Sequence, residues 1–457
     1  MNHRMIEKEY DIAVVGGGPG GLSAAVNAAR RGAKVLLVEL TSSLGGCAAS
    51  GLSILGFLDR SGKKVLGGFA QELFDRLAAV GGAIGHFPCP VHNSISPVAP
   101  EQFKILAVQL CQEAGVDLLF GCNVVDVKMT GKHIESITVY GKCTDIHIRA
   151  KIFVDGTGDG DLAYLAGCEF EKGQDNTRIN QPGTLMFTVA GYDLDKFFTY
   201  IEQHPEEAGI KEDYAQGYNL DFFRASRGHC FIGLTNTVAR ARASGDFDIP
   251  RNQMIYITSP HENFLAINTV RITNFDASDP EEFSRGVAEG YRQIGVLIRF
   301  MNKYVPGFES AVVSSISPTL GIRESRHFKG IIKLTSDSMF RYEVGPDTVA
   351  LCAYNVDIHS GTATHIDLTP LSKPFGIPYG CLVAANVDNL FLSGRTLSVD
   401  STVFAAARVM GPLIACGEAI GFAAAICSKE NVLPASLAVE RVRNAILENG
   451  GILEISP

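Results

Sequence analysis

The sequence predicts an α/β protein built on a Rossmann-like dinucleotide-binding sheet. The apolar run 10–15 indicates a buried strand, and a glycine-rich turn follows it directly. An alanine-rich helix over 22–31 and a second strand over 34–38 come next. This order of strand, turn, helix and strand is the one that a parallel βαβ unit requires.

The turn itself indicates a bound dinucleotide. Gly16, Gly18 and Gly21 have the spacing G-x-G-x-x-G, which allows a tight turn, a close approach to a pyrophosphate, and close packing of helix on strand. The free N–H groups at the helix start favour phosphate. Glu39, 18 residues after Gly21, can accept hydrogen bonds from a ribose diol and disfavours a 2′-phosphate. A glycine-rich turn without a ligand is the alternative.

Further motifs carry a family resemblance. Leu44-Gly45-Gly46 follows the second strand, residues 153–160 form a strand ending in a Gly-rich turn, and residues 389–395 form another. With these, the chain resembles the FAD-dependent oxidoreductases of the two-dinucleotide-binding-domain, glutathione-reductase-like type. One subgroup is similar along nearly the whole chain, through Asn268 to Ile272, Gly321-Ile322-Arg323-Glu324-Ser325-Arg326-His327 and Ala407-Arg408-Val409-Met410. That subgroup often has Arg in place of His327 and Gln in place of Glu418.

The resemblance implies FAD as cofactor and a set of residues around it. The strand starting near Val124 would meet adenine, and the helix after Gly411-Pro412 would point its positive end at the flavin pyrimidine. Cys47 is either a flavin neighbour or a small buried thiol. The expected FAD contacts are Gly16, Gly18, Pro19, Gly20, Gly21, Glu39, Leu40, Gly45, Gly46, Cys47, Val124, Gly156, Thr157, Gly158, Asp159, Gly394, Arg395, Arg408, Val409, Met410 and Gly411.

Three segments follow from this pattern. Residues 1–170 are expected to form the first part of a ββα-type FAD-binding domain, with a parallel sheet plus a β-meander over 116–148. Residues 171–370 would be an inserted α+β substrate domain, and residues 371–457 would complete the FAD-binding domain. No second G-x-G-x-x-G and no Cys pair beside the first motif is present, which argues against a pyridine-nucleotide–disulfide reductase.

Composition excludes several other classes. The net charge is −9 without a Lys/Arg-rich run, so a nucleic-acid partner is not expected. Eleven cysteines without a C-x-x-C pair argue against a zinc site and a disulfide framework. Arg408 and Glu418 interrupt the apolar stretch 403–427, so no membrane span is expected. We expect a cytoplasmic protein, and the sequence leaves a homo-oligomer open.

Candidate catalytic residues lie in the inserted segment and just after it. Arg323 and Arg326 could bind a carboxylate, or could form a structural network with Glu324. His359 is the candidate acid–base group, oriented by Asp357. Tyr379 could hydrogen-bond the substrate or pack in the core. Asp357, His359, His365 and Asp367 match no strong metal motif, so no metal is expected.

The expected function is therefore the dehydrogenation of a small, carboxylate-bearing substrate, with hydride transfer to flavin N5 and an electron acceptor that the sequence does not identify. Two alternatives stay open: an NAD(P)H-using flavin monooxygenase, and an electron-transfer flavoprotein subunit of a larger complex. The chain has no Fe–S cysteine cluster, so the second alternative would need a partner chain.

Overall fold

The glycine-rich turn belongs to a seven-stranded sheet. A computed structural model of the chain describes residues 4–89, 91–174, 177–209, 219–261, 264–364 and 366–454. In the sheet, the strand order is β6-β2-β1-β9-β8-β7, and β21 pairs with β9. The strands are β1 (Arg4–Val15), β2 (Val35–Glu39), β6 (Asp117–Phe120), β7 (Asn123–Thr130), β8 (His133–Gly141), β9 (Thr144–Asp155) and β21 (Leu390–Leu392).

The direction of the strands separates two halves of this sheet. β6, β2, β1, β9 and β21 pair in parallel. β7, β8 and β9 pair antiparallel and form the meander. Strand β9 therefore belongs to both halves of the sheet. Its first residues pair with β8, and its whole length lies along β1. β6 lies inside the predicted meander range, but it joins the parallel half instead.

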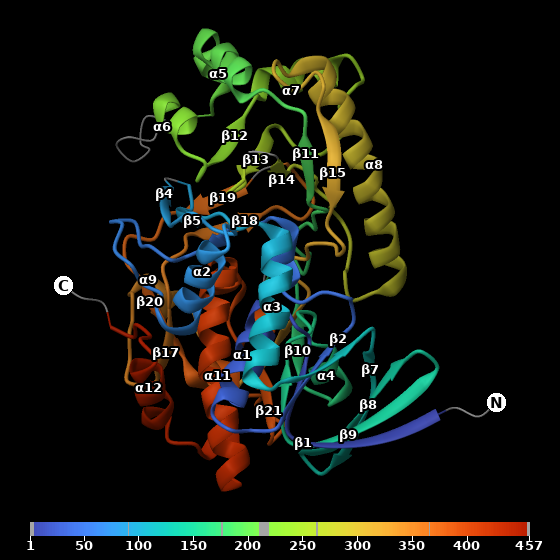
Figure 1. Cartoon of the computed structure of the whole chain (residues 1–457), viewed down its shortest axis with the longest axis vertical. Helices are drawn as coiled ribbons and strands as arrows, with labels where there is room; N and C mark the ends of the chain where they lie inside the picture. The colour runs from blue at the N-terminus through green and yellow to red at the C-terminus, as the bar shows by residue number, and fades with distance from the viewer. Residues whose placement is uncertain are drawn as a thin grey trace.

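Helices cover this sheet and contribute many residues of the first hydrophobic cluster, whose buried members run from Ile12 to Leu453. α1 (Pro19–Arg30), α3 (Pro100–Ala114) and α11 (Met410–Glu430) lie side by side, with α2 (Gly68–Ala79) and α12 (Val439–Glu448) next to them (Figure 1). Glycines allow α1 and α11 to pack closely: a Cβ on Gly417 would lie 2.2 Å from the Gly20 carbonyl oxygen. α11 is long and apolar enough to cross a membrane, yet 89% of its most apolar window is buried against the rest of the protein.

A second hydrophobic cluster runs from Leu185 to Ile322. Its antiparallel sheet has the order β12-β13-β14-β11-β15, and the long helix α8 lies along β15 (Figure 1). The strands are β11 (Phe187–Ala190), β12 (Cys230–Gly233), β13 (Met254–Thr258), β14 (Leu265–Ile267) and β15 (Val312–Ile316). The helices are α5 (Leu194–Gln203), α6 (Leu220–Ala225), α7 (Thr235–Ala243) and α8 (Pro280–Tyr304).

Small sheets and short helices connect the two clusters. The three-stranded sheet β3 (Ile54–Leu55), β5 (Asn93–Ser96) and β4 (Phe87–Cys89) lies beside the hairpin β18 (Val356–His359) and β19 (Ile366–Thr369) (Figure 1). Leu334, Val349 and Leu371 pack into the first cluster, so this stretch goes with the dinucleotide-binding half. The remaining short helices and strands are α4 (Asp161–Leu165), β10 (Phe170–Lys172), β16 (Arg326–Phe328), α9 (Ser336–Phe340), β17 (Thr348–Cys352), β20 (Phe375–Pro378) and α10 (Ser401–Ala407).

Candidate functional site: a dinucleotide cradle and a buried arginine cluster

The turns after β1 and β9 touch through glycines. Gly16 has φ +99°, and a Cβ there would lie 2.3 Å from the Gly156 backbone. A Cβ on Gly21 would lie 2.0 Å from the Gly16 carbonyl oxygen. Gly18 differs, because a Cβ there would meet only the Gly156 oxygen, at 3.8 Å. The protein leaves the space over Gly18 open, as the approach of a pyrophosphate requires.

The start of α1 and the end of β2 complete this side of the cradle. Gly18 caps α1 without a side-chain hydrogen bond, and the first turn holds no acidic residue. Glu39 accepts the Gly17 N–H at 2.8 Å and the Thr41 N–H at 2.7 Å, which fixes its carboxylate beside the turn. Gly45 donates its N–H to the Gly17 carbonyl at 2.8 Å, so the Gly45-Gly46 loop lies on the glycine turn.

The outer end of the cradle lies beside Glu39. Leu40 is 61% exposed there, and the side chain of Val124 is buried in a small core under β7. The Cys122 N–H donates to the Glu39 carbonyl at 3.3 Å, which brings the start of β7 to the end of β2. Val124 therefore offers its backbone, rather than its side chain, to the position where the resemblance puts adenine.

The turn after β9 is held from inside. Asp155 is fully buried and accepts hydrogen bonds from the Thr157 N–H at 3.0 Å, the Thr157 hydroxyl at 2.7 Å and the Ala163 N–H at 2.8 Å. Burial nevertheless raises the pKa of Asp155 to about 6. This carboxylate is thus committed to shaping the turn that carries Gly156, Thr157 and Gly158.

Arg395 joins this turn to the turn after β21. Its guanidinium donates to Asp159 at 3.0 Å, and its buried Nη1 has no partner in the described part of the chain. Gly394 has φ +73°, and no atom lies within 4 Å of where its Cβ would be. α11 begins beyond it without a side-chain cap or an acidic residue in its first turn. Open glycine turns, two uncapped helix starts and an unpartnered guanidinium nitrogen fit the phosphates and ribose of a dinucleotide.

A second polar site lies deeper, around Asp357 on β18. Its carboxylate accepts the Tyr354 hydroxyl at 3.0 Å and lies 3.5 Å from Arg408 Nη2 and 3.1 Å from His359 Nε2. Burial alone would raise the pKa of Asp357, but the positive charge and hydrogen bonds of its neighbours hold it well below the usual range. The carboxylate is therefore ionised at neutral pH.

Four guanidinium groups share the surroundings of this one carboxylate: Arg251, Arg271, Arg323 and Arg408. Arg323 donates to the Pro182 carbonyl at 2.7 Å, and Arg408 donates to the Asp357 carbonyl at 3.1 Å. Arg251 is 3% exposed, and its Nε, like the Nε of Arg408, has no partner among the described residues. Burial, and the charges of the other arginines, lower the pKa of Arg323 to about 9. Positive charge therefore exceeds negative charge in this buried cluster.

His359 has a defined tautomer. Arg271 Nη1 lies 3.3 Å from its Nδ1, and since a guanidinium only donates, Nδ1 must be the acceptor. Nε2 therefore carries the hydrogen and donates to Asp357 at 3.2 Å. Burial lowers the pKa of His359 to about 3, and the charges of Arg323 and Arg251 add to the lowering against the opposing pull of Asp357. The ring is neutral, with its lone pair directed at the arginines.

Asp159 joins the cradle to this arginine cluster. It accepts hydrogen bonds from Arg395 at 3.0 Å and from the hydroxyl of Ser325, two residues after Arg323, at 2.7 Å. Burial raises the pKa of the Cys47 thiol, and the charges of Arg395, Arg323 and Arg408 all act against that rise. Arg395 belongs to the dinucleotide cradle, and Arg323 and Arg408 belong to the arginine cluster. The two sites are therefore neighbours, which is the arrangement that a cofactor and its substrate need.

The predicted catalytic residues do not all meet here. Arg323 and His359 share the cluster, but Arg326 turns away to Asp161 at 3.0 Å and lies 4.4 Å from the Tyr164 ring centre. Tyr379 is buried and donates its hydroxyl to the Pro434 carbonyl at 3.0 Å, so it packs in the core rather than facing this cluster.

Arg251 and Arg271 are site residues that the sequence did not predict. Arg271 stands between Val270 and Ile272, and a charge inside an apolar run is a signal for a buried functional group. Arg251 carries no comparable signal.

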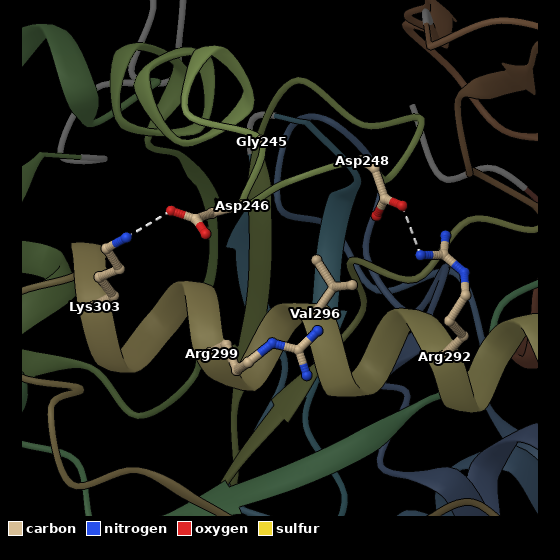
Figure 2. Close-up of a pocket in the computed structure, with 7 residues that line it drawn as sticks. All are labelled: Gly245, Asp246, Asp248, Arg292, Val296, Arg299 and Lys303. Carbon is tan, nitrogen blue, oxygen red and sulfur yellow. Dashed lines mark hydrogen bonds and ion pairs between the residues drawn. The ribbon is translucent and has the colours of Figure 1, made fainter.

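The metal alternative finds no support in the described ranges, where no group of three His, Cys, Asp or Glu side chains converges. His365 lies outside the described residues. A surface pocket of about 290 Å³ lies elsewhere, between α8 and the loop after α7 (Figure 2). Four of its charged residues pair with one another, Arg292 with Asp248 and Lys303 with Asp246, each at 2.7 Å, and Arg299 also lines it.

Solved structures of similar backbone span most of the chain. A geranylgeranyl bacteriochlorophyll reductase-like protein from Thermoplasma acidophilum is 13% identical, with a TM-score of 0.44, covering 98% of this chain and 85% of that one. The p-nitrophenol 4-monooxygenase PnpA from Pseudomonas putida DLL-E4 is 11% identical, with a TM-score of 0.49 and the same coverage. The myxobacterial chondrochloren halogenase CndH is 13% identical, with a TM-score of 0.47, covering 96% and 78%.

Sequence comparison gives a short match and a long one. A dihydrolipoyl dehydrogenase from Acholeplasma laidlawii is 65% identical over 34 residues, which is 7% of this chain and 10% of that protein. The family model for FAD-dependent oxidoreductases matches residues 11–446, which include every glycine turn of the cradle and all four arginines of the cluster. The chain belongs to the family of FAD-dependent oxidoreductases, and FAD is its cofactor.

Proposed function

We propose that this enzyme dehydrogenates a small anionic substrate, with a carboxylate held by the buried arginine cluster. One observation carries the proposal: Arg408 and Arg271 contact the Asp357–His359 pair, and the charges of Arg251 and Arg323 act on the same carboxylate. An unmatched buried ion costs several kcal/mol. A bound anion would remove that cost, so the cluster favours a negatively charged ligand.

The donors suit a carboxylate in particular. Guanidinium groups form paired hydrogen bonds with the two oxygens of a carboxylate. The Nε atoms of Arg251 and Arg408 are buried and unpartnered in the described part of the chain, so each has a donor to give. Cys47 marks the side of the cluster that faces the cofactor cradle.

His359 is the group that would take the proton. FAD, when bound, supplies the hydride acceptor N5 of its flavin ring. Nδ1 of His359 carries the lone pair, and Asp357 orients the ring from Nε2. The charges of Arg323 and Arg251 depress the basicity of this ring. An anion bound to those arginines offsets their charge, so substrate binding itself makes His359 a better base.

The test is an anaerobic visible spectrum recorded while small acids, alcohols, sugars and amines are added one at a time. We expect one carboxylate-bearing compound to bleach the flavin band and uncharged compounds to leave it unchanged. Bleaching by NADH alone would replace the proposal with the monooxygenase alternative. Bleaching by uncharged donors as readily as by carboxylates would contradict the role of the arginines.

Arg251→Met gives a sharper version of this test. Arg251 makes no side-chain hydrogen bond to a described residue, so its removal breaks no bond and relieves repulsion among the arginines. We expect the variant to unfold at an equal or higher temperature and to bind the carboxylate at least about tenfold more weakly. Arg292→Met, on exposed α8, is the matched control and should bind it normally. An unchanged Kd in Arg251→Met would contradict the proposal.

A further inference from the structure

Cys89 and His92 form a hydrogen-bonded pair on the turn between β4 and β5. The Cys89 sulfur lies 3.3 Å from His92 Nδ1, and the Cys89 residue is 3% exposed. An imidazole nitrogen at this distance favours the thiolate over the thiol.

Charged and titratable groups from other elements complete the surroundings. The His92 ring lies parallel to Tyr354, with ring centres 6.1 Å apart, and Tyr354 donates to Asp357 on β18. Cys230 on β12 shares the small apolar cluster that holds Cys89. Burial opposes charge on both partners, yet Cys89 and Asp357 raise the pKa of His92, and His92 lowers the pKa of Cys89. The pair therefore favours thiolate and imidazolium.

Other buried thiols behave in the opposite way. Burial raises the pKa of Cys111, Cys168 and Cys352 to about 12, because no cation pairs with them. Burial also raises the pKa of Cys230, which lies in the same apolar cluster as Cys89. The imidazole, rather than the apolar surroundings, thus sets Cys89 apart.

A second polar atom points to a ligand beside this sulfur. Asn93 is the cross-strand partner of Cys89 in the pairing of β4 with β5, so the two residues are neighbours in the backbone pairing. Asn93 is 4% exposed and donates through Nδ2 to the Ala353 carbonyl at 2.7 Å. Its Oδ1 is buried and has no partner among the described residues. This oxygen needs a donor that the surrounding protein does not supply.

We propose that Cys89, His92 and Asn93 form a reactive-thiol site that takes a small peroxide, with hydrogen peroxide as the simplest member. Cys89 supplies the nucleophile, Asn93 Oδ1 accepts the peroxide O–H, and His92 supplies a proton. The sulfur forms an S–O bond as the O–O bond breaks, and the His92 proton joins the departing hydroxide to give water. Cys89 is oxidised by two electrons to the sulfenic acid, and the peroxide is reduced by the same two electrons.

The site is separate from the proposed dehydrogenation, because its reaction needs neither the flavin nor the carboxylate substrate. The test treats the FAD-loaded protein, without an electron donor, with equimolar hydrogen peroxide and a dimedone trap. Peptide mass spectrometry then locates the adduct. We expect the adduct at Cys89 and a rate that rises less than about threefold per pH unit between pH 6 and 8, because a thiol paired with an imidazole is more ionised than an ordinary one. An ordinary thiol reacts about tenfold faster per pH unit in this range.

Two variants separate the pair from its surroundings. His92→Gln should lower the Cys89 rate at pH 6 at least about tenfold and restore the rise with pH. Cys230→Ser, a change in the same apolar cluster, should leave the rate unchanged. Flavin absorbance and the unfolding temperature check that each variant is folded. The proposal fails if exposed Cys143 is modified while Cys89 is not, or if the Cys89 rate in the wild type rises tenfold per pH unit.

Discussion

His359 shows how a single residue depends on its two neighbours. Asp357 fixes one ring nitrogen, and Arg271 lies at the other, so the ring has one orientation and one tautomer. Burial lowers the pKa of the ring, and the charges of Arg323 and Arg251 add to the lowering, while Asp357 opposes it. A base of this kind has little affinity for a proton until an anion binds to the arginines. Substrate binding and proton transfer are therefore coupled.

His359→Gln tests that role. The glutamine amide still donates toward Asp357, but it has no titratable lone pair, so proton transfer should fail while the site keeps its shape. We expect anaerobic flavin reduction by the carboxylate donor to slow by roughly a hundredfold or more. The carboxylate Kd should change less than about threefold, because the arginines remain. A reduction rate near that of the wild type would exclude His359 as the proton acceptor.

Glu418 is a buried carboxylate outside the site. It accepts the Phe69 N–H at 3.1 Å at the start of α2 and an Asn449 N–H at 2.5 Å. Burial raises its pKa to about 7. Between about pH 4.5 and 7 the folded protein thus holds a proton that the unfolded chain has lost. Stability attributable to this group falls as the pH rises through that window, by about 3 kcal/mol at most.

Glu418→Gln should remove this pH dependence. Glutamine keeps an acceptor for the Phe69 N–H and carries no charge to bury. We expect the variant to unfold at a higher temperature than the wild type at pH 8, and at nearly the same temperature at pH 5. Thermal unfolding at the two pH values measures the difference. A variant less stable than the wild type at pH 8 would show that the charge itself is needed, and the similar subgroup's frequent Gln would then be unexplained.

Arg323 and Arg326 illustrate what the sequence does not reveal at this scale. Their spacing suggested one carboxylate-binding pair, but residues three apart in an extended segment point to opposite faces. Arg323 therefore enters the arginine cluster, and Arg326 reaches Asp161. The remaining arginines of the cluster come from distant segments, and no spacing rule connects Arg251 with Arg408. The Asp357–His359 pair was predictable because it is local.

At the scale of elements, local signals predicted helices well. The helix predicted over 22–31 is α1 (Pro19–Arg30), and α8 begins at a local signal of the same kind, because Asp279 caps it by accepting the N–H groups of Glu281 and Glu282. β6 shows the limit, because nothing inside Asp117–Phe120 specifies that its partner is β2 rather than β7. Within the expected substrate segment 171–370, the sequence likewise gives no sign that the chain packs again into the first hydrophobic cluster near Leu334. The pairing and packing of distant elements cannot be read from the spacing of residues along the sequence.

In the glycine turn between β1 and α1, one glycine is needed for folding and another for binding FAD. Gly21→Ala would place a Cβ 2.0 Å from the Gly16 oxygen, so it should destabilise the protein itself. Gly18→Ala meets nothing closer than 3.8 Å and has φ −65°, which alanine adopts freely. We expect Gly18→Ala to stay folded, losing about 1 kcal/mol at the helix cap. FAD affinity should fall at least about tenfold, because the added methyl occupies the pyrophosphate approach. Flavin fluorescence titration measures it, and unchanged affinity would contradict the cradle.

The molecule as a whole is acidic, with a net charge of −9, yet its deepest polar cluster is cationic. The positive charge is therefore a local feature rather than part of a basic surface.

Binding of the cofactor also depends on the whole fold. Its expected contacts run from Gly16 to Gly411 and come together only when the chain is folded. FAD should consequently bind the native state and have no comparable site on the unfolded chain.

Thermal unfolding should report this linkage. At free FAD of 100 times its Kd, binding to the native state alone contributes about 2.7 kcal/mol. For a chain of this length, that corresponds to a rise of roughly 3 °C in the unfolding temperature. Gly18→Ala should unfold close to the wild-type apoprotein, and a tenfold loss of affinity would reduce the rise at the same FAD concentration to about half. A full rise in that variant would mean that FAD is held chiefly by the other turns, through Arg395 and the start of α11, and that the glycine turn after β1 contributes shape rather than affinity.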